Sequence, residues 1–195
     1  MTARRALLRL RRDAQGATIV EFALLAPVLV LMLLGLFDIG YNTYTSSVLQ
    51  GAIAKAARGS TIEGAQPATL DARVEAAVHD IAPNATLVFA RKAYTNFADV
   101  GAPEDFSDLN GDNMCNDGEP FEDANGNGSW DTDRGIAGGG GARDAVLYTV
   151  TVSYPRAFPI ADFIGVSDTH QVESSTVLRN QPWDDQDVEA KLGNC

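Results

Sequence analysis

The segment GATIVEFALLAPVLVLMLLGLF, residues 16–37, contains a single charged residue, Glu21. Its uncharged run, residues 22–37, would form about 24 Å of helix, slightly less than the apolar core of a bilayer. Extending the helix back to Ala17 supplies the missing turn but places Glu21 inside the apolar segment, where an isolated carboxylate is unfavourable. The sequence therefore predicts a transmembrane helix over residues 17–39 that carries a carboxylate in need of a partner.

Basic residues lie on one side of this segment only. Five arginines precede it, and the first basic residue after it is Lys55. Because positive charge stays on the cytoplasmic side, we expect a single-pass protein of the inner membrane, with residues 40–195 in the periplasm or at the cell surface. A cleaved secretory signal is the alternative, but no Ala-x-Ala site follows the apolar core.

Several residues of the segment carry a family resemblance. Residues 16–40 resemble the N-terminal signature of TadE-like pilus assembly proteins, the pseudopilin or minor-pilin group of the tight-adherence (Flp, type IVc) pilus. The matching residues are Gly16, Glu21, Phe22, Ala23, Pro27, Gly35 and Gly40. The resemblance implies that a prepilin peptidase cuts between Gly16 and Ala17 and removes a basic leader, residues 1–16. Retention of the leader is the alternative.

Glu21 would be the fifth residue of the processed chain. By resemblance to pilins, its carboxylate would pair with the free amino group of a neighbouring subunit's first residue. Burial in lipid favours such pairing, since it relieves the cost of an isolated charge. The alternative is that Glu21 of an uncleaved anchor reaches the membrane interface on its own.

The overall charge limits the partners. The chain carries a net charge of −11, and the leader alone is basic, so the remainder is strongly acidic. Such a chain gains nothing by releasing counterions from phosphates, which argues against nucleic acid. The expected partners are other pilin or pilus assembly subunits, the prepilin peptidase and the lipid bilayer.

Apolar periodicity predicts two helical regions after the membrane segment. Spacings of three and four continue the first helix to Gly59 and Ser60. A second helix is predicted to be capped by Thr69 and to stop before Pro83. Its apolar stripe indicates core packing rather than a binding groove.

Three strands are predicted to follow, at residues 86–90, 146–154 and 171–179, the second with strict alternation of apolar and polar residues. Between the last two, RAFPIADFIG at residues 156–165 is an apolar connector that we expect to pack on the sheet, with a place near the membrane surface as the alternative. The fold class is α+β: a long N-terminal helix that continues into a small domain with an antiparallel sheet, an architecture that the resemblance also implies.

An acidic insertion, residues 104–134, interrupts this domain. Residues 104–133 hold ten Asp or Glu and no Lys or Arg, so the segment needs a counter-ion. Its first half fits the twelve-residue calcium loop, with Asn113 where glycine is usual; Asn enters the left-handed region readily. The expected ligands are Asp108, Asn110, Asp112, the Met114 carbonyl, Asn116 and Glu119.

A second copy of the loop begins at Asp123. Its expected ligands are Asp123, Asn125, Asn127, Asp131 and Asp133. Asp133 is included because the twelfth residue, Arg134, cannot ligate a cation. Oxygen ligands and the absence of histidine favour calcium over zinc or copper. The alternative is an acidic loop without a ligand.

Cys115 lies inside the first loop and Cys195 ends the chain. In an oxidising compartment these two cysteines would form a disulfide within the chain; the alternatives are that they remain free thiols or form a bridge between subunits.

His79 and His170 stand beside no recognisable nucleophile, so we expect no enzymatic activity. The sequence thus predicts a pseudopilin-like or minor-pilin-like structural protein that takes part in assembling a Tad pilus for surface adhesion, with a loop ordered by calcium. The alternative is a membrane-tethered, calcium-dependent adhesion module that enters no filament.

Overall fold

The computed structural model describes residues 16–60, 66–141, 143–159, 161–180 and 191–195. These form two compact units. The first contains the start of the long helix together with Arg156–Asp168, and the second contains Tyr44–Pro155 and Thr169–Cys195. Residues 1–15 of the predicted leader lie outside the described residues.

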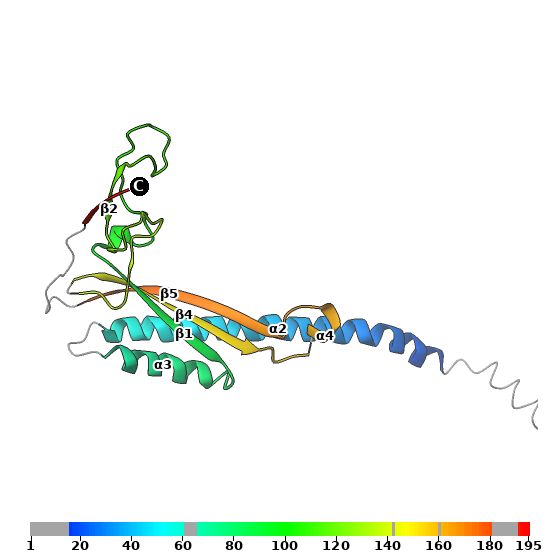
Figure 1. Ribbon diagram of the computed structural model, residues 1–195. Helices are drawn as coiled ribbons and strands as arrows, with labels where there is room; N and C mark the ends of the chain where they lie inside the picture. Colours follow the sequence, from blue (N-terminus) through cyan, green and yellow to red (C-terminus); the bar gives the residue numbers. More distant parts are fainter. Residues whose placement is uncertain (1–15, 61–65, 142, 160, 181–190) are drawn as a thin grey trace, which may run out of the picture. The chain divides into compact units, whose positions relative to one another are not determined.

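The long helix α2, Ala17–Ser60, runs without interruption through Pro27 (Figure 1). It extends to Ser60, the last described residue before position 66, so the predicted helix is present up to Gly59 and Ser60. One helix in the described part of the chain, Thr18–Gly59, is long and apolar enough to cross a membrane. This confirms the long N-terminal apolar helix.

The second helix, α3, spans Pro67–His79 and buries Leu70, Val74 and Val78. It begins two residues before the predicted cap. Its N-cap is Gln66, with no side-chain capping bond, so the prediction that Thr69 caps the helix is wrong. Pro67 explains the earlier start, because proline fixes a helical φ and its missing N–H is not needed in the first turn.

Four antiparallel strands form the main sheet, in the order β3, β1, β4, β5. They are β1 (Thr86–Tyr94), β3 (Ile136–Ala137), β4 (Ala145–Pro155) and β5 (Thr169–Arg179). The three predicted strands are confirmed, and each is longer than predicted because ladder pairing extends past its apolar core. In β4 the alternation is strict, with Val146, Tyr148, Val150, Val152 and Tyr154 all buried.

The core lies between this sheet and the two helices. Leu49 and Ile53 of α2 are 0% and 1% exposed. A side-chain carbon built on Gly59 would lie 3.4 Å from Leu70, so α2 and α3 touch there. Figure 1 shows α3 and the C-terminal part of α2 running along the sheet.

A polar cluster fastens α3 to the sheet. Arg91 donates two hydrogen bonds to Asp71, at 3.1 and 2.5 Å, and its guanidinium stands 4.6 Å from the centre of the Tyr148 ring. The Tyr148 hydroxyl donates to the same carboxylate at 2.6 Å. Burial, then the hydrogen bond to Asp71, raise the pKa of Tyr148, so the phenol stays protonated and keeps donating.

The acidic insertion lies between β1 and β4 in sequence. The short helix η1 (Phe97–Asp99) precedes it, and the insertion itself contains the strand β2 (Pro120–Asp123). β2 pairs antiparallel with β6 (Lys191–Asn194) at the C-terminus, a pairing that the sequence did not predict. Phe121 of β2 is 1% exposed, and a side-chain carbon on Gly193 opposite it would collide with its ring. Only glycine fits at that position of β6.

Candidate functional site

The first acidic loop folds around the carboxylate of Asp108. Its Oδ1 accepts the Gly111 amide at 2.6 Å and its Oδ2 accepts the Asn113 amide at 3.0 Å. Asn113 has φ 61°, so the left-handed conformation expected at this sixth position is present. The loop thus has a turn in which the N–H groups of its fourth and sixth positions point at the side chain of its first residue.

Glu119 closes this loop from its twelfth position. The residue is 2% exposed, and its Oε1 accepts the amides of Leu109 and Asn110 at 2.7 and 3.3 Å. Its Oε2 accepts the Asn116 amide at 3.4 Å. The buried charge is therefore satisfied by three backbone donors from the second, third and ninth positions.

In the middle of the first loop, the side-chain amide of Asn110 contacts two neighbouring side chains. Asn110 Nδ2 lies 3.2 Å from Asp112 Oδ2 and 3.0 Å from Asn116 Oδ1. Hydrogen bonds from Asn116 and from the Met114 amide lower the pKa of Asp112, which keeps it charged. The Asn110 side-chain nitrogen thus donates to two side-chain oxygens, while its Oδ1 accepts the Asp112 amide at 2.9 Å.

The second loop repeats the first at its start. Asp123 Oδ1 accepts the Gly126 amide at 2.7 Å, and its Oδ2 accepts the Gly128 amide at 2.9 Å. These are the fourth and sixth positions, the same two that Asp108 binds in the first loop. Asp131 Oδ2 accepts the side-chain amides of Asn125 and Asn127 at 2.7 and 2.6 Å.

Glu104 takes the role in the second loop that Glu119 has in the first. It precedes both loops in sequence, is 1% exposed, and accepts the Ala124 amide at 2.9 Å and the Asp131 amide at 3.0 Å. These donors are the backbone amides of the second and ninth positions of the second loop. Glu119 binds the amides of the same two positions in the first loop. The role of Glu104 was not predicted from the sequence. The spacing of residues within a loop gives no information about a side chain from outside that loop that binds its amides.

Asp133 has other partners. Its carboxylate accepts the Lys92 ammonium at 2.6 Å and the Tyr94 hydroxyl at 2.9 Å. Burial acts to raise its pKa, but hydrogen bonds from Lys92 and Gly135 hold the pKa below its usual range. Burial, then the bond to Asp133, raise the pKa of Tyr94 to about 12. Asp133 therefore ties the insertion to β1.

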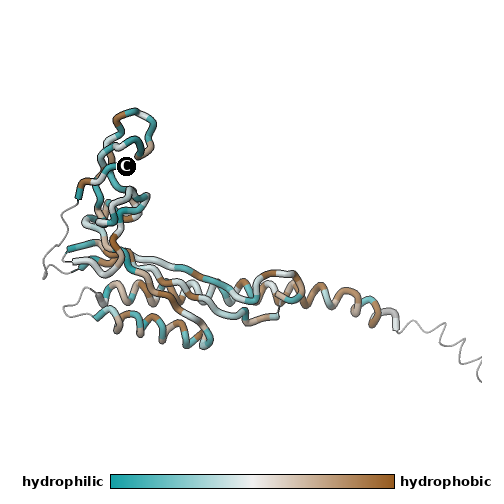
Figure 2. The backbone as a smooth tube through the Cα atoms, viewed as in Figure 1, coloured by the Kyte–Doolittle hydropathy of each residue, from teal (hydrophilic) through white to brown (hydrophobic). Residues whose placement is uncertain are grey.

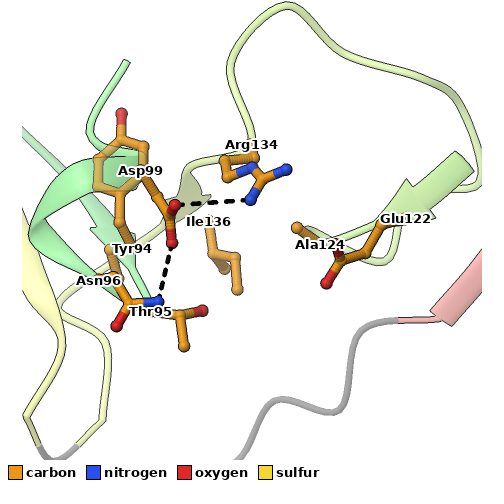
Figure 3. Close-up of a pocket in the computed structure, with 9 residues that line it drawn as sticks. Tyr94, Thr95, Asn96, Asp99, Glu122, Ala124, Arg134 and Ile136 are labelled. Atoms are coloured by element: carbon orange, nitrogen blue, oxygen red, sulfur yellow. Dashed lines mark hydrogen bonds and ion pairs between the residues drawn. The ribbon is translucent and has the colours of Figure 1, made fainter. Parts of the chain in front are cut away.

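Arg134, at the twelfth position of the second loop, turns toward a polar pocket of about 330 Å³ (Figure 3). It pairs with Asp105 at 2.6 Å and lies 3.6 Å from Asp99, which also accepts a bond from Asn96. Figure 3 shows the Glu122 side chain across the same space. The pocket is lined by Ala93, Tyr94, Thr95, Asn96, Asp99, Glu122, Ala124, Arg134 and Ile136. Its one cation is thus engaged by carboxylates.

The metal expectation rests on these loops. Within the described residues, no three side chains of His, Cys, Asp or Glu are grouped so that they could hold a metal ion. Asparagines fill several of the proposed ligand positions beside the carboxylates. Asparagine and backbone oxygens suit calcium, so the donor set fits a hard cation while the binding itself stays a prediction.

Cys115 and Cys195 form a disulfide, one of the three states that the sequence left open. Their Cα atoms are 5.5 Å apart, and the Cys195 amide donates to the Glu119 carbonyl at 2.8 Å. The bond closes a span of 80 residues. It joins the first loop to β6 and so to the C-terminus.

The predicted processing residues lie at the start of α2. Gly16 precedes the helix, and its carbonyl accepts the Val20 amide at 3.2 Å. The Glu21 side chain is exposed, and so are large apolar side chains around it, such as Phe22 at 65% and Leu25 at 68%. Figure 2 shows hydrophobic residues throughout this part of α2. The helix therefore begins with an apolar surface that no other described residue covers.

Both histidines make ordinary structural contacts. His79 Nε2 lies 3.0 Å from the Ala85 carbonyl, and the His170 ring lies 5.7 Å from the Tyr154 ring.

An exposed apolar helix that leads into a small α+β domain is the architecture of a membrane-anchored protein with one spanning segment. Residues 16–58 match the model of the family described as TadE-like protein. The match confirms the resemblance seen in residues 16–40 and extends it almost to the end of α2. No curated protein and no solved structure matches the chain.

Proposed function

We propose that this protein is a pseudopilin-like or minor-pilin-like component in the assembly of a Tad pilus, anchored in the inner membrane by the start of α2. The observation that carries the proposal is the exposed apolar surface of α2 within the segment that matches TadE-like proteins. An exposed surface of this kind needs lipid or another apolar helix around it.

Glu21 gives the proposal its mechanism. Its carboxylate is exposed on an otherwise apolar part of α2, four residues after the Ala17 amide. Cleavage after Gly16 would create an ammonium group at Ala17. In lipid this ammonium and the Glu21 carboxylate of a neighbouring subunit would each be unfavourable alone, so pairing them drives the subunits together.

The proposed orientation places the C-terminal domain in the periplasm. Five arginines in the leader favour a cytoplasmic N-terminus. The disulfide Cys115–Cys195 supports the same orientation, because such bonds persist in oxidising compartments and are rare in the cytoplasm.

The experiment compares filaments sheared from cells that express the wild-type chain, Glu21→Gln or Leu25→Ala. Glu21→Gln removes the charge while keeping the shape, and Leu25→Ala is a matched change on the same exposed stretch. We expect wild type and Leu25→Ala to support filament formation and Glu21→Gln to reduce it at least tenfold, with all three equally abundant in membranes. Equal filament yield from Glu21→Gln would contradict the proposed pairing. A normal yield from cells lacking the chain would favour the tethered adhesion module.

We also propose that calcium orders the acidic insertion. The support is the repeated geometry of the two loops, in which Glu119 and Glu104 each satisfy the second and ninth amides. Calcium would bring charge compensation to a segment whose ten carboxylates repel one another. The candidate ligands come from the same residues that hold the turns.

Trp130 supplies the readout for this proposal. Its indole N–H donates to the Glu104 carbonyl at 2.8 Å, and its ring packs edge-on against Phe106. After chelator treatment, addition of calcium to about 10 mM, above the range of extracellular sites, should change the fluorescence of this residue and raise the melting temperature. Asp108→Asn combined with Glu104→Gln should abolish both responses, and Asp117→Asn, an exposed change in the same insertion, should keep them. A melting temperature unchanged by calcium would reject the calcium proposal.

A further inference from the structure

The connector between β4 and β5, Arg156–Asp168, presents three apolar side chains to the outside. Phe163 is 64% exposed, Ile164 57% and Val166 41%. The sequence favoured packing of this segment on the sheet, but of its described apolar residues only Ala161 is fully buried, at 7% exposed. The exposed group needs a partner of its own.

This connector is an ordered loop. Its ends are joined by two hydrogen bonds from Arg156, one from the amide to the Asp168 carbonyl and one from Nε to the Ser167 carbonyl, both 2.8 Å. The short helix α4, Ala161–Ile164, forms its tip and is closed by a bond from the Gly165 amide to the Ala161 carbonyl at 2.9 Å. Gly165 has φ 70°, a conformation that suits glycine. The apolar tip is therefore built into the fold.

The loop is fixed to α2 where the uncharged run ends. The Phe158 ring stacks on Phe37 with centroids 5.9 Å apart, and Arg156 forms an ion pair with Asp38. Asp38 is the first charged residue after Glu21 and is only 5% exposed. A lone charge at the end of the apolar run would oppose contact with lipid, and the ion pair with Arg156 lowers that cost.

We propose that the tip of this loop, formed by Phe163, Ile164 and Val166, inserts into the interfacial layer of the bilayer at the outer end of the membrane span. The proposal rests on the proposed membrane anchorage of α2. Its support is continuity, because Phe158 and Arg156 join the loop to Phe37 and Asp38, which stand in sequence between exposed apolar residues of α2: Leu36, at 64%, and Ile39, at 65%. Figure 2 shows hydrophobic colour on both α2 and this loop.

Charge sets the kind of insertion. Asp162 and Asp168 have exposed side chains, while the loop's one cation, Arg156, is held by Asp38. The loop therefore has no cationic side chain to attract anionic headgroups, and the partner is the apolar boundary of the headgroup layer. The two carboxylates would remain in water and limit the depth to the side chains of the tip. The loop would then hold α2 at a fixed depth and rotation.

The test is photo-crosslinking of the full chain in vesicles of phosphatidylethanolamine and phosphatidylglycerol. A benzophenone amino acid replaces Phe163, Leu25 or Phe97 in separate preparations. Leu25 reports on the proposed span. Phe97 is the matched control, because it is a phenylalanine in η1 with a similar exposure of 73%. Mass spectrometry distinguishes lipid adducts from adducts between two copies of the chain.

We expect lipid adducts at Leu25 and at Phe163, with the yield at Phe163 at least fivefold above that at Phe97. Lipid adducts at Leu25, together with a Phe163 yield no higher than that of Phe97, would overturn the insertion and leave the membrane anchor intact. Adducts at Phe163 only to a second copy would also overturn it and identify the tip as a contact between subunits. Absence of lipid adducts at both Leu25 and Phe163 would overturn the anchor as well.

Discussion

The first part of α2 and the domain that follows use the same kinds of side chain in opposite ways. In residues 17–37 large apolar side chains face outward, as Leu24 does at 73% exposure, whereas Leu49 and Ile53 later in the same helix are 0% and 1% exposed. A water-soluble fold explains the second pattern and leaves the first without a partner. The difference indicates that the start of this continuous helix has a surface suited to an apolar environment, whereas its later part packs into a domain suited to water.

The largest expected effect comes from a charge placed in each part. Ile53→Asp would bury a carboxylate without a partner and should destabilise the domain by at least about 4 kcal/mol. Leu29→Asp, at a position 50% exposed, should leave the domain stable but oppose membrane insertion by about 2.5–3.5 kcal/mol. Urea unfolding in detergent and a membrane-insertion assay separate the two effects. Unfolding of the domain by Leu29→Asp, or an intact domain in Ile53→Asp, would contradict the proposed difference between the two parts of α2.

Loss of the disulfide should affect one part of the domain more than the other. Changing both Cys115 and Cys195 to serine removes a bond across 80 residues, and such a loss costs about 2–5 kcal/mol. We expect faster amide hydrogen exchange in β2 and β6 and unchanged exchange in β4, which is held by apolar packing. Equal acceleration in β4 would show that the domain unfolds as one unit.

Glu104→Gln tests the polar interior of the insertion. The substitution removes the charge that satisfies the Ala124 and Asp131 amides, and should cost about 1–3 kcal/mol, while Asp117→Asn on the exposed surface should change stability by less than about 0.5 kcal/mol. Urea midpoints of the two variants give the comparison. Equal midpoints would contradict the role of Glu104 as the buried carboxylate that holds the second loop.

The smallest effect concerns pH. Because the pKa of Tyr94 is raised to about 12, the unfolded chain loses this proton near pH 10 while the folded chain keeps it. Stability from this group is therefore complete below about pH 10 and falls between about pH 10 and 12. Tyr94→Phe should make the urea midpoint less sensitive to pH over that interval. An unchanged slope would contradict the raised pKa of Tyr94 in the folded chain.

Sequence reasoning succeeded where the determinants are local. The alternation of β4 and the apolar spacing of α3 repeat within a few residues, so each element could be recognised in isolation. The left-handed Asn113 was predictable for the same reason, because the calcium-loop pattern fixes the turn at its sixth position. Asn is one of the few residues that adopt that turn readily.

The rest depends on residues far apart in sequence. Glu104 reaches the Ala124 amide across 20 residues, and β2 pairs with a strand near the C-terminus. The predicted ligand role of Asp133 rests on adjacency in sequence, whereas its ion-pair partner, Lys92, lies 41 residues away. No local pattern records such pairings.

The central claim is that the first part of α2 is a processed pilin-like membrane segment, and the mass of the intact chain extracted from native membranes tests it most directly. We predict a chain that begins at Ala17 and lacks residues 1–16, with the disulfide intact and Glu21 as its fifth residue. A chain that retains residues 2–16 would contradict prepilin-type processing and leave a signal-anchored protein.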